Sequence, residues 1–77
     1  MSEERKQEIK ERKLKIAARL KALRESRGFT PLQVAEMLEI TPQAYYQYES
    51  GDRIPADEVK VAIAKLYNRS VATIFFA

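Results

Sequence analysis

From Leu14 onward, the hydrophobic residues of the chain recur at the spacing of amphipathic helices. Ile16, Leu20 and Leu23 are four and three residues apart, which places them on one helical face. Gly28 follows them as a residue suited to the left-handed conformation that ends a helix. The pattern therefore predicts a first helix that buries one face and ends at Gly28.

Two short helices follow, and each begins with threonine and proline. Thr30 and Thr41 are predicted N-caps, because a threonine hydroxyl accepts a hydrogen bond from the first helical turn. Pro31 and Pro42 suit the first helical position, where no backbone N–H is needed. Gln33 completes a capping box on the first of these helices. Local chemistry therefore predicts where both helices begin.

The remaining pattern adds two more helices. After a predicted loop at residues 52–55, Asp57 and Glu58 open a helix whose positive dipole end they stabilise. Asn68 is a predicted left-handed stop, and Ser70 caps a last short helix. The later helices are expected to bury Val34, Ala35 and Leu38; Val59, Ile63 and Leu66; and Val71, Ile74 and Phe75. The fold class is therefore all-α, with five helices and no strand.

Composition removes several classes of function. The chain has 77 residues, enough for one small domain, and it contains no cysteine and no histidine. It therefore lacks disulfides, thiolate nucleophiles and the commonest general base and metal ligand. The longest apolar stretch, residues 71–77, is too short to span a bilayer. We expect a soluble cytoplasmic binding protein, with no enzymatic activity, no cofactor and no small-molecule ligand.

Charge is unevenly distributed along the chain. Residues 1–27 carry ten Lys and Arg against five Glu, a net +5, whereas residues 28–77 carry four against six, a net −2. A basic end indicates an anionic partner, with nucleic acid as the first candidate, although a solvated helix also explains such a run. Residues 1–13 contain a single aliphatic residue, Ile9, so they form either a helical extension or a frayed tail. Residues 14–77 form the predicted domain.

The two short helices lie only about three residues apart, joined around Glu39 and Ile40. Neither can bury its apolar face alone, so they must cross steeply against the other helices, as in a helix-turn-helix. The second helix of the pair then projects from the domain. Its exposed face can enter a DNA major groove, which is about 12 Å wide.

A set of short motifs runs from about Ile16 to Phe76. Its clearest parts are Leu20-x-x-Leu23-Arg24, Gly28-Phe29-Thr30, Val34-Ala35-x-x-Leu38-x-Ile40, Tyr48-Glu49-x-Gly51-x-Arg53-x-Pro55, Ile63-Ala64 and Ser70-Val71-x-x-Ile74-Phe75. Their order and spacing resemble the Cro and phage-repressor type of helix-turn-helix protein, the XRE-like family. The resemblance implies a five-helix lambda-repressor-like fold. It also implies a sequence-specific transcriptional regulator, a repressor of phage or prophage type, that reads DNA with the helix Thr41–Ser50.

By this resemblance, the residues that read bases fall on Pro42, Gln43, Tyr46 and Gln47. Gln43 and Gln47 are four residues apart and share one helical face. A glutamine amide can form two hydrogen bonds with adenine, and the methyl group of Ala44 can contact a thymine methyl. Tyr46 can stack on a sugar or bind a phosphate.

The resemblance also assigns structural roles. Tyr45 and Tyr48 match core positions. Arg24 matches an arginine that pairs with the glutamate at Glu49, which ties the first helix to the end of the third. Gly51 follows the recognition helix, where a positive φ is needed.

The chain departs from the family pattern in ways that affect DNA binding. Residues 30–50 contain three glutamates and no Lys or Arg. Phosphate contacts must therefore come from helix N-termini, from the basic first helix, and from Thr30, Thr41, Ser50 and Arg53. Glu39 also stands where a glycine is common, and a left-handed conformation there would cost about 1 kcal/mol.

Two hypotheses remain for the function. In the first, the chain is a DNA-binding regulator that binds a pseudo-palindromic operator as a homodimer in the nucleoid, with Phe76 or the charged extension at the dimer contact. In the second, it is a protein-interaction module on the same fold, such as an antitoxin-like partner or accessory regulator. The Gln43–Gln47 face favours the first, and the lack of basic residues between Thr30 and Ser50 favours the second.

Overall fold

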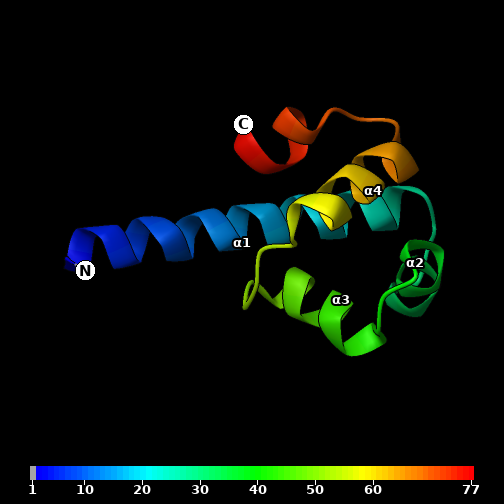
Figure 1. The fold of residues 1–77 in the computed structure, drawn as a ribbon, viewed down its shortest axis with the longest axis horizontal. Coiled ribbons are helices and arrows are strands. Elements are labelled where there is room, and N and C mark those ends of the chain that lie inside the picture. The colour runs from blue at the N-terminus through cyan, green and yellow to red at the C-terminus, as the bar shows by residue number, and fades with distance from the viewer. Residues whose placement is uncertain (1) are drawn as a thin grey trace.

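The computed structural model describes residues 2–77. The elements are α1 (Glu3–Ser26), α2 (Pro31–Leu38), α3 (Pro42–Ser50), α4 (Asp57–Tyr67) and η1, a π-helix (Ala72–Phe76). The later helices gather around the C-terminal half of α1, and its N-terminal half projects away from them (Figure 1). Over residues 2–77 the all-α prediction is confirmed, with five helices and no strand. No helix in this part of the chain is long and apolar enough to cross a membrane.

The charged N-terminal segment forms the first half of α1. Ser2 caps the helix by accepting a hydrogen bond from the Arg5 N–H at 3.3 Å, and Glu3 and Glu4 lie in its first turn. Acidic residues stabilise this positive end of the helix dipole. The helix then continues without a break through Lys13. Of the two alternatives for residues 1–13, the structure has the helical extension over residues 3–13, and Met1 lies outside the described residues.

The short helices begin at the caps that the sequence predicts. The Gln33 N–H donates to Thr30 Oγ1 at 3.2 Å, and the Thr30 N–H donates to Gln33 Oε1 at 2.8 Å. This reciprocal pair is the predicted capping box. Thr41 likewise accepts a hydrogen bond from the Ala44 N–H at 3.1 Å.

Four residues in the left-handed region end helices or follow their ends. Gly28 (φ 70°), Gly51 (φ 83°) and Asn68 (φ 54°) are residue types that adopt this conformation readily. Glu39 is the fourth, with φ 58° at the end of α2. Because glutamate has a Cβ, this residue carries backbone strain at the turn between α2 and α3.

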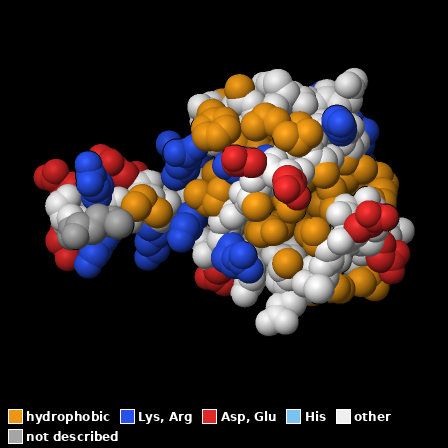
Figure 2. All heavy atoms as spheres, in the orientation of Figure 1, with side chains coloured by type: hydrophobic (Ala, Val, Ile, Leu, Met, Phe, Trp, Pro, Cys, Tyr) orange, Lys and Arg blue, Asp and Glu red, His pale blue; other side chains and the backbone are white. Residues whose placement is uncertain are grey.

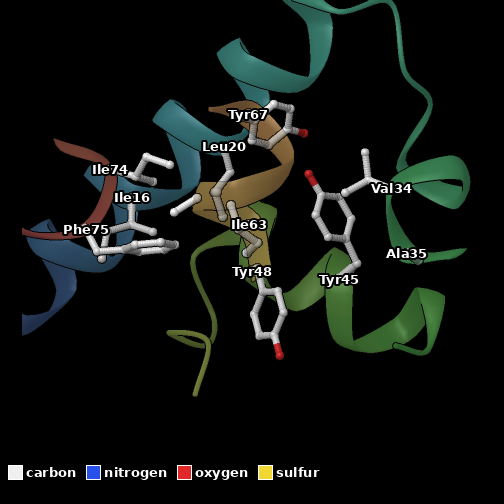
Figure 3. Packing of buried hydrophobic residues seen from close by; sticks show 11 residues of the cluster. Ile16, Leu20, Val34, Ala35, Tyr45, Tyr48, Ile63, Tyr67, Ile74 and Phe75 are labelled. Carbon is white, nitrogen blue, oxygen red and sulfur yellow. The ribbon is translucent and has the colours of Figure 1, made fainter. Parts of the chain in front are cut away.

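The core is formed by one buried face from each element. Its largest fully buried side chains are Ile16, Leu20, Val34, Tyr45, Ile63, Tyr67, Ile74 and Phe75. Figure 3 shows Leu20 and Ile63 between the Phe75 end of this cluster and Tyr45. The placement of Tyr45 and Tyr48 in the core is confirmed. In α4, Tyr67 is buried although the sequence did not predict it. Two residues that were predicted to be buried, Val59 and Leu66, are only partly buried.

The C-terminal segment folds back onto α1 and is held by arginines. Arg19 donates to the carbonyls of Ile74 (3.0 Å) and Ala77 (2.7 Å). Ser70 caps the segment as predicted, accepting a hydrogen bond from the Thr73 N–H at 3.1 Å. The helix itself has the wider π pitch. Phe75 is buried, whereas 57% of Phe76 is exposed.

Candidate nucleic-acid interface

Helix α3 lies at the edge of the domain and divides its side chains between two environments. Tyr45 and Tyr48 are buried, with their rings in an edge-to-face arrangement at 6.4 Å. Gln43 and Tyr46 are exposed, and Gln47 is partly exposed. The two buried tyrosines therefore anchor α3 and direct its polar face toward solvent.

An ion pair anchors the C-terminal end of α3 to α1. Arg24 Nε lies 2.7 Å from Glu49 Oε2, and Arg24 Nη2 lies 3.0 Å from Glu49 Oε1. The third guanidinium nitrogen, Nη1, donates to the Phe29 carbonyl at 2.9 Å. The two side chains are only 12% and 11% exposed, and the hydrogen bond to Glu49 raises the pKa of Arg24. This bidentate geometry fixes both the position and the orientation of α3 on α1.

Beyond α3, the chain turns back so that Arg53 reaches Gln47. The Gln47 carbonyl accepts hydrogen bonds from the backbone N–H groups of Asp52 (3.0 Å) and Arg53 (3.2 Å). Arg53 Nη1 also donates to Gln47 Oε1 at 3.3 Å. Because an amide oxygen has two lone pairs, Gln47 keeps one acceptor position and its NH₂ group for another partner. Arg53 therefore orients Gln47 and places a positive charge beside it.

The hydroxyl groups proposed to contact phosphate differ in their surroundings. Thr30 and Thr41 accept backbone hydrogen bonds as N-caps, which leaves each hydroxyl proton able to point outward to an anion. The Ser50 hydroxyl lies 2.8 Å from Asp52 Oδ2 and 3.1 Å from the Gln47 carbonyl oxygen. The Ser50 hydroxyl proton is therefore already used in a hydrogen bond within the protein, and the neighbouring Asp52 carboxylate repels phosphate. The geometry thus favours Thr30, Thr41 and Arg53 over Ser50.

The remaining candidates lie on α3 itself. Tyr46 is 54% exposed, and its position on α3 is on the same helical face as the two glutamines. Ala44 is small and partly buried against the core, so it offers a partner little surface. No group of three or more acidic residues within residues 2–77 is placed to hold a metal ion.

Comparison with known proteins agrees with this geometry. The sequence matches the helix-turn-helix family over residues 20–74, which include α2, α3 and α4. The chain belongs to the XRE-like helix-turn-helix family. This XRE-like protein is a DNA-binding regulator, and its family is not one of enzymes. No curated protein and no solved structure matches the chain significantly.

Two contacts around α3 in this XRE-like protein were not predicted from the sequence. The hydrogen bond between Arg53 and Gln47 joins a loop residue to a helical one, and no local pattern predicts a contact across that turn. The second is the packing of Gly51 on α1, where an added Cβ would lie 2.9 Å from Leu14 Cδ2. In the sequence, Leu14 is marked only as the first residue of the hydrophobic pattern.

Proposed function

We propose that this XRE-like protein is a transcriptional repressor of phage or prophage type that binds the DNA major groove with α3. The observation that carries this proposal is the division of α3 into a buried tyrosine face and an exposed face of Gln43, Tyr46 and Gln47. A helix held by the core and by a buried ion pair presents these side chains in one orientation. Such preorganisation is what discrimination between bases requires.

In this proposal the side chains have separate tasks. Gln43 and Gln47 each bind adenine through two hydrogen bonds, and Tyr46 contacts the sugar-phosphate backbone. Thr30, Thr41 and Arg53 bind phosphates and position α3 in the groove. Arg53 contributes to both tasks, because it also orients Gln47.

One such domain covers about half of an operator, so we propose a two-fold dimer on a pseudo-palindromic site. The exposed Phe76 ring supports a contact at the C-terminal surface. The Arg12 guanidinium lies 4.9 Å from the centre of this ring, and Lys60 Nζ lies 5.0 Å from it. These cation–π contacts hold the ring in place at the surface.

Selection of bound sequences from a pool of random 30-base-pair duplexes tests the proposal. We expect enrichment of a two-fold symmetric sequence whose half-sites are about 10 base pairs apart, centre to centre. Gel shifts of the enriched duplex and of a scrambled one, at two salt concentrations, then separate specific from non-specific binding. Absence of any enriched sequence would contradict the proposal.

One observation favours a second candidate, a protein-interaction module on the same fold. Residues 30–50 contain three glutamates and no basic residue, so the surface of α2 and α3 carries little positive charge. This candidate predicts no enriched DNA sequence. It also predicts binding of a partner protein that is abolished by substitutions at Gln43 and Gln47.

A further inference from the structure

The charges of the N-terminal half of α1 are sorted onto different faces. Lys6, Lys10 and Lys13 are spaced by four and three residues, which places them on one face of the helix. Glutamates with the same spacing start two residues earlier, at Glu4 and Glu8, and an offset of two residues is a rotation of about 200°. Glu4 and Glu8 therefore lie on the opposite side, whereas Glu3, three residues before Lys6, lies near the lysines. We call the three lysines the lysine stripe.

The ion pair with α3 shows which side of α1 carries the lysine stripe. Arg24 binds Glu49, so the face of α1 that bears Arg24 is the face turned toward α3. Lys6 precedes Arg24 by 18 residues, about five helical turns, and Lys13 precedes it by 11, about three turns. The stripe thus continues the α3-facing side of α1 beyond the domain. Figure 2 shows basic side chains on this extension, along both its upper and its lower edge.

The stripe begins next to the loop that follows α3. Leu14 touches Gly51 in that loop, and Lys10 precedes Leu14 by four residues, about one helical turn. Arg53 lies two residues after Gly51. The basic residue at the end of α3 and the lysines of the extension therefore lie along one side of the molecule.

The three lysines are available to a partner. The ion pairs within residues 2–77 are Lys21–Glu25, Arg24–Glu49 and Lys60–Asp57, so none of them involves the stripe. Lys6 and Lys10 are exposed, and Lys13 is partly exposed. Their backbone positions span about 10 Å along the helix axis, comparable to about three phosphates on one DNA strand.

We propose that the lysine stripe binds the phosphate backbone of double-stranded DNA beside the bases that α3 reads. This inference rests on the proposed function, because it places the DNA along the exposed face of α3. It assigns to the extension the positive charge that residues 30–50 lack. The contacts are to phosphates, so they add affinity without sequence preference.

The test compares two variants that lose the same charge. The stripe variant is Lys6→Gln/Lys10→Gln/Lys13→Gln, and the control is Arg5→Gln/Lys15→Gln/Lys65→Gln, which removes three exposed cations from other faces. Fluorescence anisotropy measures binding of each full-length chain to a random-sequence 30-base-pair duplex over a series of salt concentrations. Circular dichroism and thermal melts establish that both variants remain folded.

Each phosphate contact contributes about 0.9 to the slope of log affinity against log salt. We expect the stripe variant to lose about 2 to 3 units of slope and the control to lose less than about 1. Equal slopes for the two variants would overturn the assignment. A stripe variant that keeps the wild-type slope but no longer sediments with phosphatidylserine vesicles would also overturn it, in favour of a membrane.

The salt-slope measurement and the selection of bound sequences together distinguish failure of the lysine-stripe proposal from failure of the proposed repressor function. A selected operator sequence combined with an unchanged salt slope overturns the stripe alone. A slope that falls as expected, without any selected sequence, supports the stripe as a DNA contact and overturns the proposed specific repressor.

Discussion

The guanidinium of Arg24 and the carboxylate of Glu49 form two parallel hydrogen bonds of 2.7 and 3.0 Å in a largely buried site. The two residues are 25 positions apart in the chain. Together with the hydrophobic packing between the two helices, this contact joins α1 to α3. It therefore helps to hold the proposed recognition helix and to set the direction in which the N-terminal extension turns its lysines.

Loss of this ion pair is expected to be costly. Glu49→Ala leaves the Arg24 guanidinium mostly buried without its partner, which should lower the free energy of unfolding by about 3 kcal/mol. Glu25→Ala is the matched control, because the Lys21–Glu25 pair is exposed and should contribute less than about 1 kcal/mol. Urea denaturation measures both values. Similar small losses in the two variants would contradict the buried pair.

Alkaline pH should destabilise the protein through two buried tyrosines. Burial raises the pKa of Tyr45 and Tyr67 above the ordinary value of about 10, and the nearby Glu49 charge acts in the same direction. The folded state then keeps protons that the unfolded state releases. The stabilisation is complete below about pH 10 and is lost as the pH rises above it, by at most about 1.4 kcal/mol per pH unit for each tyrosine.

Tyr45→Phe tests this explanation. The Tyr45 hydroxyl is buried without a hydrogen-bond partner, so its removal should change stability at pH 7 by less than about 1 kcal/mol. The decline above pH 10 should be clearly shallower than that of the wild type in urea titrations. Tyr46→Phe, at an exposed position, is the control. An undiminished decline in Tyr45→Phe would show that another group is responsible.

Sequence choice should depend on the glutamines of α3. Gln43→Ala or Gln47→Ala should weaken binding to the selected operator by about 1–3 kcal/mol and leave binding to random DNA nearly unchanged. Arg53→Ala should weaken both and lower the salt slope by about 1. Titrations of both duplexes by anisotropy provide the comparison. Equal losses on both duplexes for Gln47→Ala would refute direct reading of bases.

The C-terminal surface should support cooperative loading of two copies on DNA. Phe76→Ser removes an exposed ring without opening the core, since Phe75 fills the buried position beside it. We expect sedimentation velocity to show weakened or lost cooperativity for this variant with the operator duplex. Met37→Ser, which removes another exposed apolar side chain, should behave as the wild type does. Full cooperativity in Phe76→Ser would place the dimer contact elsewhere.

Because the turn between α2 and α3 is strained, we expect substitution by glycine to have opposite effects on stability at two positions. Glu39→Gly should raise the free energy of unfolding by about 0.5 kcal/mol, because glycine adopts φ 58° without strain but gains entropy when unfolded. Glu36→Gly, inside α2, should lower it by about 1 kcal/mol. Thermal melts measure both variants. A loss in Glu39→Gly as large as that in Glu36→Gly would mean that the turn carries no strain.

The sequence alone determined where most helices begin and end. Thr30 and Thr41 cap their helices through hydrogen bonds to residues three positions later, and Gly51 and Asn68 end theirs by adopting a left-handed backbone. These interactions are local, so the residue types themselves carry the information. The all-α fold follows from them together with the helical spacing of the hydrophobic residues.

Tertiary structure decided how these helices face one another. The spacing of Lys6, Lys10 and Lys13 places them on one side of α1, but the packing of α1 against α3, including the bond between Arg24 and Glu49, turns that side toward α3. The contact of Arg53 with Gln47 likewise exists only once the loop has turned back on its helix. The helical repeat fixes the angle between any two residues of the same helix, so the sequence shows which of them share a face. The direction of each face in space depends on contacts between residues that lie far apart in the chain or across a turn, and no local pattern encodes them.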